Sequence, residues 1–118
     1  MEKPFDIAER TFALAVRVVA LCKALREANV FPEIIRQLLK AGTSVGANVS
    51  EAQSSQSRAD FISRMTVALK EGRETLFWLR LIAATEASFR SSLGDDIKET
   101  NEIVSVLVTI IGKAKHQE

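Results

Sequence analysis

The sequence predicts an all-α protein that folds as an antiparallel up-down-up-down four-helix bundle. In four separate segments, apolar residues recur at alternating three- and four-residue steps, which is the spacing of an amphipathic helix. Glycine and proline are scarce, five and two residues in a chain of 118, so the regular segments between turns are long. Tyrosine is absent and aromatic residues make up only 6% of the chain, which argues against a β-sandwich or a β-barrel.

The first predicted helix covers about residues 5–28 and carries two neighbouring apolar stripes. One stripe consists of Ile7, Thr11, Leu14, Val18, Leu21 and Leu25, and the other of Ala8, Phe12, Ala15, Val19 and Cys22. Together they form a broad apolar face, the width expected of a helix packed in a bundle. We therefore expect both stripes to face neighbouring helices.

The second predicted helix covers about residues 32–54. Pro32 suits its first position, where the missing N–H has no helical partner to lose. The apolar stripe consists of Ile35, Leu38, Gly42, Val45, Val49 and Ala52. Because glycine lowers helix stability, Gly42 inside this stripe indicates close approach of another helix.

The third predicted helix covers about residues 58–86. Ser57 and Asp60 have the spacing of a capping box, with Ser57 as the N-cap. The apolar stripe has a seven-residue period and consists of Ile62, Met65, Leu69, Gly72, Leu76, Leu79 and Ala83. Gly72 repeats the pattern of Gly42 and predicts a second close helix contact.

The fourth predicted helix covers about residues 94–114, after a loop over 88–94 in which Ser92 and Asp95 form a second capping pair. The β-branched run 103–111 has no second strand to pair with, so we interpret it as helical. Its apolar residues nearly encircle the helix axis. One bundle face cannot bury them all, which indicates oligomerisation.

The length fits a single domain, residues 1–118, and a net charge of +1 lacks the basic excess typical of proteins that bind phosphate backbones. One cysteine, Cys22, cannot form an internal disulfide, which favours a reducing compartment. The apolar run 12–22 is no signal peptide, because acidic residues precede it and Arg17 interrupts it. We expect a cytoplasmic protein without a membrane span.

The residue content also argues against an enzyme. The only histidine, His116, lies in the C-terminal tail, so neither a di-iron site nor a zinc site has enough ligands. Cys22 lies on an apolar face without a histidine base, so we expect a buried structural thiol. There is no glycine-rich phosphate loop or nucleophile elbow. The sequence therefore predicts no catalytic residue, no metal site and no cofactor.

Two features of the middle helices point to a subunit interface. A polar strip runs beside the apolar stripe of the second helix, with possible partners in Lys70 or Arg73 of the third. Phe77 and Trp78 lie off the apolar stripe of the third helix, and aromatic residues are enriched at interfaces. The candidate interface residues are Ser44, Asn48, Glu51, Lys70, Arg73, Glu74, Phe77 and Trp78.

Two other functions stay open as alternatives. Binding of RNA or DNA requires basic residues of the first two helices to converge, and the candidates are Arg10, Arg17, Lys23, Arg26, Arg36 and Lys40. An enzyme with its site at a subunit junction would use Asn48, Glu51, Lys70 and Glu74, and requires a deep pocket with a perturbed carboxylate.

Most of the chain, from about residue 5 to residue 111, resembles a known family. The segments that carry the resemblance are 44–52 (SVGANVSEA), 57–61 (SRADF), 68–75 (ALKEGRET) and 78–81 (WLRL). They resemble the bacterial proteins called four helix bundle proteins, which include proteins encoded in intervening sequences of large-subunit ribosomal RNA genes. The accessory variability determinant of diversity-generating retroelements is related to this family.

The resemblance implies an antiparallel bundle that assembles as a homopentamer, a barrel-like ring with a central pore. It also implies, from the retroelement relatives, binding of nucleic acid and a reverse transcriptase through basic surfaces. Two segments differ from many relatives. Ser50-Glu51-Ala52 stands in place of Ala-Glu-Gly, and Ser55 and Gln56 replace basic loop residues. The loss of these positive charges argues against the nucleic-acid binding that the resemblance implies, as the near-neutral composition also does.

Overall fold

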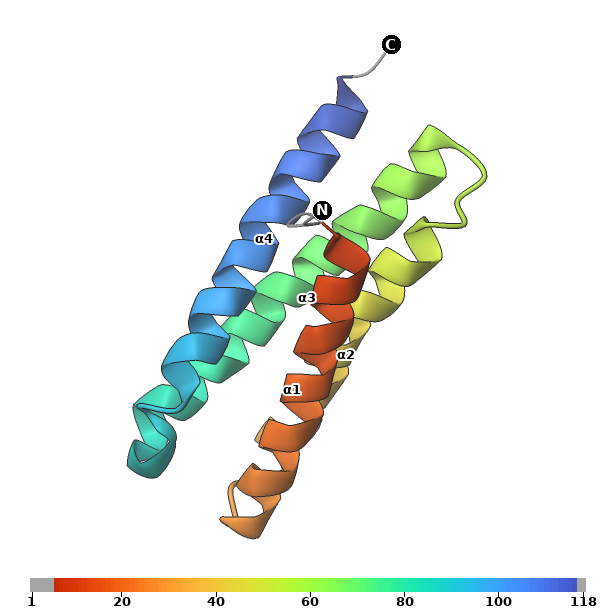
Figure 1. Cartoon of the computed structure of the whole chain (residues 1–118). Helices are drawn as coiled ribbons and strands as arrows, with labels where there is room; N and C mark the ends of the chain where they lie inside the picture. Colours follow the sequence, from red (N-terminus) through yellow and green to blue (C-terminus); the bar gives the residue numbers. More distant parts are fainter. Residues whose placement is uncertain (1–5, 117–118) are drawn as a thin grey trace.

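A computed structural model describes residues 6–116 and confirms the all-α four-helix class. The α-helices are α1 (Ile7–Glu27), α2 (Pro32–Ala52), α3 (Arg58–Thr85) and α4 (Leu93–Lys115), with a short 3₁₀ turn η1 (Ala87–Phe89) before α4. Successive helices run in opposite directions, and the bundle is elongated, with principal extents of 50 × 29 × 22 Å (Figure 1). None of these helices is long and apolar enough to cross a bilayer.

Local chemistry explains where the helices begin. The side chains of Asp6 and Ser57 accept hydrogen bonds from Glu9 N (3.2 Å) and Asp60 N (3.1 Å), which confirms Ser57 as the N-cap of α3. Pro32 is the first residue of α2, as predicted. Ser92 is the N-cap residue of α4, as predicted, but its hydroxyl makes no capping hydrogen bond and donates to Phe89 O instead.

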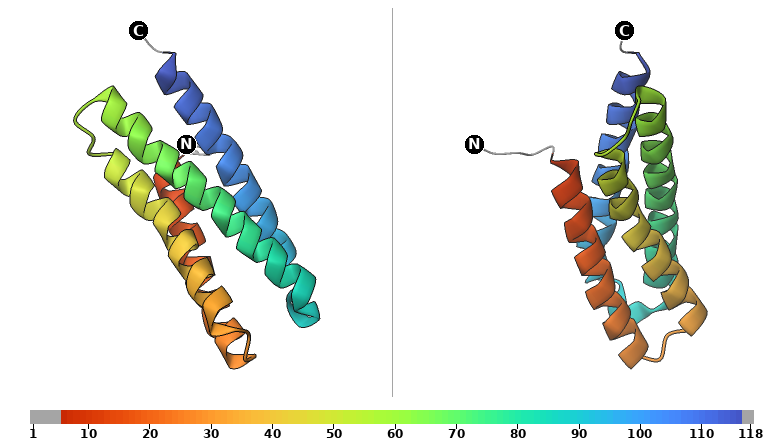
Figure 2. Two further views of the ribbon diagram at one scale, coloured as in Figure 1. Left: turned by 180° about the vertical axis from the view of Figure 1, so that it is seen from behind. Right: turned by 90° about the vertical axis from the view of Figure 1, so that its right-hand side faces the viewer.

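The helices pack as two hairpins, α1–α2 and α3–α4, joined mainly through α2 and α3. The pairs α1–α2, α2–α3 and α3–α4 pack along most of their lengths, whereas α1 and α4 touch much less. The two hairpins diverge toward their closed ends, so that α1 and α4 are separated there (Figures 1 and 2). The bundle is therefore open along its α1–α4 side.

The core consists of aliphatic side chains from all four helices. The largest fully buried apolar side chains are Leu14, Leu25, Leu38, Met65, Leu79, Ile82, Leu93, Ile103, Leu107, Val45 and Val49. Cys22 is buried and unpaired, as expected.

Glycines mark the closest helix crossings. A Cβ added at Gly42 would lie 2.7 Å from Val18, and one at Gly72 would lie 3.2 Å from Val104, which confirms both predicted contacts. The sequence patterns missed Gly46, where an added Cβ would lie 3.0 Å from the backbone oxygen of Thr11.

Several expected apolar faces differ in the structure. Phe12 and Val19 were expected to pack within the bundle but are exposed, because α1 contacts one helix extensively and turns this flank to solvent. The buried stripe of α3 consists of Met65, Ala68, Gly72, Thr75, Leu79 and Ile82. Leu69 and Leu76 of the predicted stripe are only partly buried, because the buried stripe is turned to the side of Ala68 and Thr75.

Candidate interaction surfaces

The described residues contain no cluster of side chains suited to holding a metal ion. No group of three or more His, Cys, Asp or Glu side chains comes together within residues 6–116. Burial raises the pKa of the Cys22 thiol, which disfavours the reactive thiolate. The features that could bind a partner are instead surfaces, formed by charged and exposed apolar side chains.

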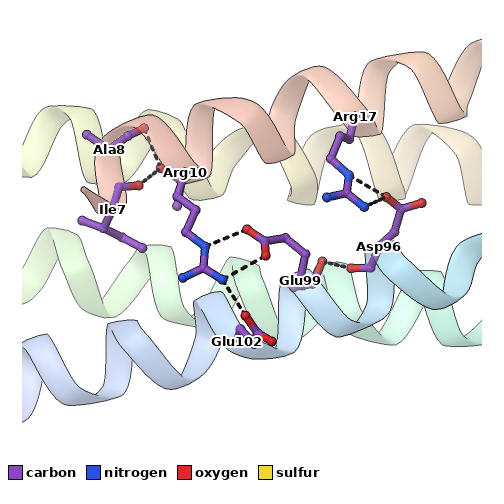
Figure 3. Close-up of polar contacts among 9 residues, drawn as sticks. Ile7, Ala8, Arg10, Arg17, Asp96, Glu99 and Glu102 are labelled. Atoms are coloured by element: carbon purple, nitrogen blue, oxygen red, sulfur yellow. Dashed lines mark hydrogen bonds and ion pairs between the residues drawn. The ribbon is translucent and has the colours of Figure 1, made fainter. Parts of the chain in front are cut away.

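The contact between α1 and α4 is made by a network of ion pairs (Figure 3). The Arg10 guanidinium donates to both carboxylate oxygens of Glu99, at 2.8 and 2.9 Å, and to Glu102 at 2.7 Å. Arg17 donates to Asp96 at 2.8 Å, so a second pair lies two turns along α1. The side chains of Arg10 and Glu99 are only 25% and 23% exposed. These bonds bridge the two hairpins where apolar packing is thin.

This network shifts the pKa values of its members. The hydrogen bond to Glu99 raises the pKa of Arg10, and the reciprocal bond from Arg10 lowers the pKa of Glu99. Burial opposes both shifts, so the bidentate pairing outweighs the cost of desolvation. Both groups are held in their charged forms.

The candidate nucleic-acid residues therefore divide into two groups. Arg10 and Arg17 are engaged with carboxylates of α4 and do not join a basic surface. The other four are exposed and lie in the half of the α1–α2 hairpin that is nearer its turn; they are Lys23, Arg26, Arg36 and Lys40. Of these four, Arg26 and Arg36 line a common groove.

The expected polar seam of α2 is satisfied locally. Asn48 Nδ2 donates to Ser44 O at 2.9 Å, within the same helix. Within the chain Glu51 pairs with Arg64 at 2.8 Å rather than with Lys70 or Arg73. Those two basic residues are exposed on α3. Asn48, Glu51, Lys70 and Glu74 do not line a common pocket among those found, so the geometry gives no support to an enzyme site there.

Phe77 and Trp78 have different environments. Their rings meet edge to face, with centroids 5.0 Å apart and planes at 83°. Phe77 is 56% exposed, in agreement with its predicted position off the core. Trp78 instead packs against the core cluster, so the expectation that it lies away from the core is wrong. Its Nε1 is buried and has no hydrogen-bond partner within the described residues.

Sequence reasoning missed an exposed apolar face on the α1–α2 hairpin. We call the side chains Phe12, Val16, Val19 and Leu39 the α1–α2 face, and all four are exposed. Phe12 is 69% exposed and borders a hollow lined by Ala8, Glu9, Gly46 and Ser50. The signal was present in the sequence as helical 12-16-19 spacing beside the true core stripe.

A separate apolar hollow lies on α4. It has a volume of about 410 Å³ and is lined by Ser105, Val106, Thr109, Ile110 and Lys113. Arg10 contacts Glu99 and Glu102, so this C-terminal stretch of α4 extends past the beginning of α1 (Figure 1). The hollow is thus on a part of α4 that α1 leaves uncovered.

The comparisons with known proteins agree with this architecture. Residues 3–109 match the family model described as 23S rRNA-intervening sequence protein. The chain is also similar to a crystal structure of a protein of unknown function from the S23 ribosomal protein family of Bacteroides thetaiotaomicron. The identity is 40%, with 90% of this chain and 95% of that chain covered and a TM-score of 0.84. No curated protein matches.

Neither of these descriptions names an enzymatic activity. The match extends over nearly all of α1 to α4 and includes the segments that carry the resemblance noted in the sequence. The chain belongs to the 23S rRNA-intervening sequence protein family.

Proposed function

We propose that this protein is a non-enzymatic helical-bundle module that acts as a homo-oligomer, with a pentameric ring as the favoured form. The observation that carries the proposal is the α1–α2 face, which exposes four large apolar side chains, three of them at helical spacing along α1. Contiguous exposed apolar patches of this kind mark interaction sites in soluble proteins.

The size of this face suits the centre of an interface. A phenylalanine buries roughly 150–250 Å² when it is fully covered, and the three aliphatic side chains add to this. A stable interface buries about 1,200–2,000 Å² in total, so the α1–α2 face supplies its apolar core and polar surroundings supply the rest. Phe12 is the expected anchor.

The second apolar surface explains why a ring is favoured over a two-fold dimer. The hollow on α4 lies on a different part of the molecule from the α1–α2 face. Contact between two different patches is head-to-tail, and head-to-tail contacts close into rings when the rotation permits. Glu9 beside Phe12 and Lys113 beside the hollow have opposite charges, which favours this pairing. The family resemblance implies that the ring contains five copies.

Substitution of Phe12 tests this proposal. Phe12→Glu places a charge at the centre of the proposed interface, so we expect dissociation to monomers at micromolar concentration in light scattering coupled to gel filtration. Val67→Glu is the matched control, because Val67 is also exposed but lies on α3. A wild-type monomer, or a Phe12→Glu variant with unchanged mass, contradicts the proposal.

A second candidate function is that of a nucleic-acid-binding accessory protein. The observation that favours it is the groove at the α1–α2 turn that Arg26 and Arg36 both line, with Lys23 and Lys40 exposed on the same two helices. Repetition of this cluster around a ring would add avidity to a modest patch. Binding of short RNA and DNA at two salt concentrations tests it, because phosphate contacts predict a steep loss of affinity with salt.

The proposal also includes the cellular compartment of the protein. We place the assembly in the cytoplasm, where a buried unpaired thiol such as Cys22 stays reduced.

A further inference from the structure

The turn between α1 and α2 holds an exposed aromatic ring in a fixed position. Phe31 is 72% exposed, the largest exposed fraction among the large apolar side chains of the described residues. The residue before it, Val30, is buried, and the residue after it, Pro32, begins α2. The ring is therefore exposed although its backbone is anchored on both sides.

Hydrogen bonds make this anchoring rigid. Val30 N donates to Leu25 O at 3.1 Å and Asn29 N to Arg26 O at 3.0 Å, which is the Schellman arrangement that ends a helix. Asn29 has a φ of 61°, a left-handed conformation that asparagine tolerates better than most residues. Because the turn is ordered before any ligand binds, little entropy is lost when a ligand stacks on the ring.

A groove of about 390 Å³ lies at the same turn, and both chain neighbours of Phe31 line it. It is lined by Arg26, Asn29, Val30, Pro32, Ile35, Arg36 and Leu39. Its floor is mostly apolar and its rim carries two guanidinium groups. This combination suits a flat, partly apolar group attached to an anion.

The charges around the groove favour an anionic ligand. Lys23, Arg26 and Lys40 form no ion pair with any residue of the range 6–116. Arg36 pairs with Glu33, which also accepts from Gln37. That pair is largely exposed, so a phosphate can compete for Arg36 at small cost. The other nearby carboxylate, Glu27, leaves the cluster with a basic excess.

We propose that the α1–α2 turn is a binding site for single-stranded nucleic acid, in which an unpaired base stacks on Phe31 and Arg26 and Arg36 contact the flanking phosphates. This inference rests on the second candidate function and assigns it a site and a substrate class. Aromatic rings beside a basic groove are the means by which proteins bind single strands, whereas the bases of a duplex are already stacked on each other. Arginine can also stack on a base plane, which adds to the preference for a single strand.

The test measures binding by fluorescence anisotropy of the full chain. The probes are a short labelled RNA strand and the same strand annealed to its complement, at about 50 and 200 mM salt. The variants are Phe31→Ala, Phe31→Trp and Arg26→Gln. Phe77→Ala and Arg80→Gln are matched controls, because both residues are exposed on α3. Circular dichroism shows whether each variant is folded.

The expected results separate stacking from charge. We expect Phe31→Ala to weaken single-strand binding about 5-fold or more, and Phe31→Trp to restore it. We expect Arg26→Gln to reduce the magnitude of the salt slope by about 0.7, the contribution of one phosphate contact on a single strand. The control variants Phe77→Ala and Arg80→Gln should bind the single strand as tightly as the wild type. Phe31→Ala should leave the affinity for the duplex unchanged.

Three results overturn the proposal, and they are distinguishable. If no probe binds at low salt, nucleic-acid binding itself is wrong. If the wild type binds but Phe31→Ala binds equally well, nucleic-acid binding stands and the site is elsewhere. If the duplex binds as tightly as the single strand, or if poly-glutamate displaces the RNA at equal charge concentration, the turn recognises charge alone and its partner is an acidic surface.

Discussion

Replacement of Arg10 by methionine tests how the two hairpins are held together. Arg10 makes three hydrogen bonds to two carboxylates of α4, and its side chain is three-quarters buried. Methionine keeps much of the apolar stem but removes the guanidinium. Glu99 and Glu102 then face each other without a counter-ion, one turn apart on α4.

The magnitude follows from the degree of burial. A hydrogen bond to a charged group contributes about 1.5–3 kcal/mol, and breaking a fully buried pair costs about 3–5 kcal/mol. Because water still reaches this pair, we expect a loss of about 2 kcal/mol in the free energy of unfolding. Arg36→Met is the control, since Arg36 and Glu33 are 67% and 60% exposed and such pairs contribute about 0–1 kcal/mol.

Urea unfolding followed by circular dichroism measures both values. A lower transition midpoint with an unchanged slope shows a loss of stability rather than a change in the unfolded chain. Measurement at several protein concentrations separates this loss from any loss of subunit contacts. If Arg10→Met costs no more than Arg36→Met, the ion pairs between α1 and α4 do not stabilise the contact between the two hairpins and this reasoning is wrong.

Three further predictions concern pH, close packing and the aromatic pair. The hydrogen bond from Arg10 lowers the pKa of Glu99 in the folded protein below the ordinary value of a glutamate, so its contribution to stability is present above that ordinary value and is lost as the pH falls toward the folded pKa. Acid titration of unfolding should show a shallower slope for Glu99→Gln, and equal slopes contradict the assignment. Gly46→Ala should lower the free energy of unfolding by about 1–3 kcal/mol in chemical denaturation, because the new Cβ meets the backbone of α1. Gly112→Ala has open space around the new Cβ and should raise the free energy of unfolding by about 0.5–1 kcal/mol. If the two single variants change stability in the same direction, the close contact at Gly46 is refuted. Trp78→Ala should cost about 2–4 kcal/mol of stability and Phe77→Ala less than 1 kcal/mol, since only Trp78 packs against the core. Thermal unfolding of the two variants measures both losses. A larger loss for Phe77→Ala than for Trp78→Ala would show that Trp78 is a surface residue.

The sequence contained enough information for the fold because the strongest signals are local. The stripe that includes Leu38, Val45 and Val49 faces the core as its helical period predicts. Ser57 and Pro32 begin their helices because capping and the missing N–H depend only on nearby backbone. The family resemblance was also confirmed over residues 3–109.

The surfaces were harder to predict because they depend on how the helices diverge. Periodicity gives the apolar residues of α1 but not the number of neighbouring helices, so Phe12 was assigned to a packed face. Periodicity also does not show which charged side chains of different helices lie opposite each other. Arg10 and Arg17 were grouped with the basic candidates because the pattern does not show that α4 places carboxylates opposite them. Trp78 was misplaced because the buried stripe of α3 includes Ala68, Thr75 and Ile82, which the predicted stripe lacks.

The oligomeric mass of the wild-type protein in solution is the most direct measurement of the proposed function. Sedimentation velocity at micromolar concentration should give one species of five times the 13.0 kDa chain mass, built through the α1–α2 face. A single species of 13.0 kDa that persists as the concentration is raised would show that the exposed apolar side chains do not join copies of this chain.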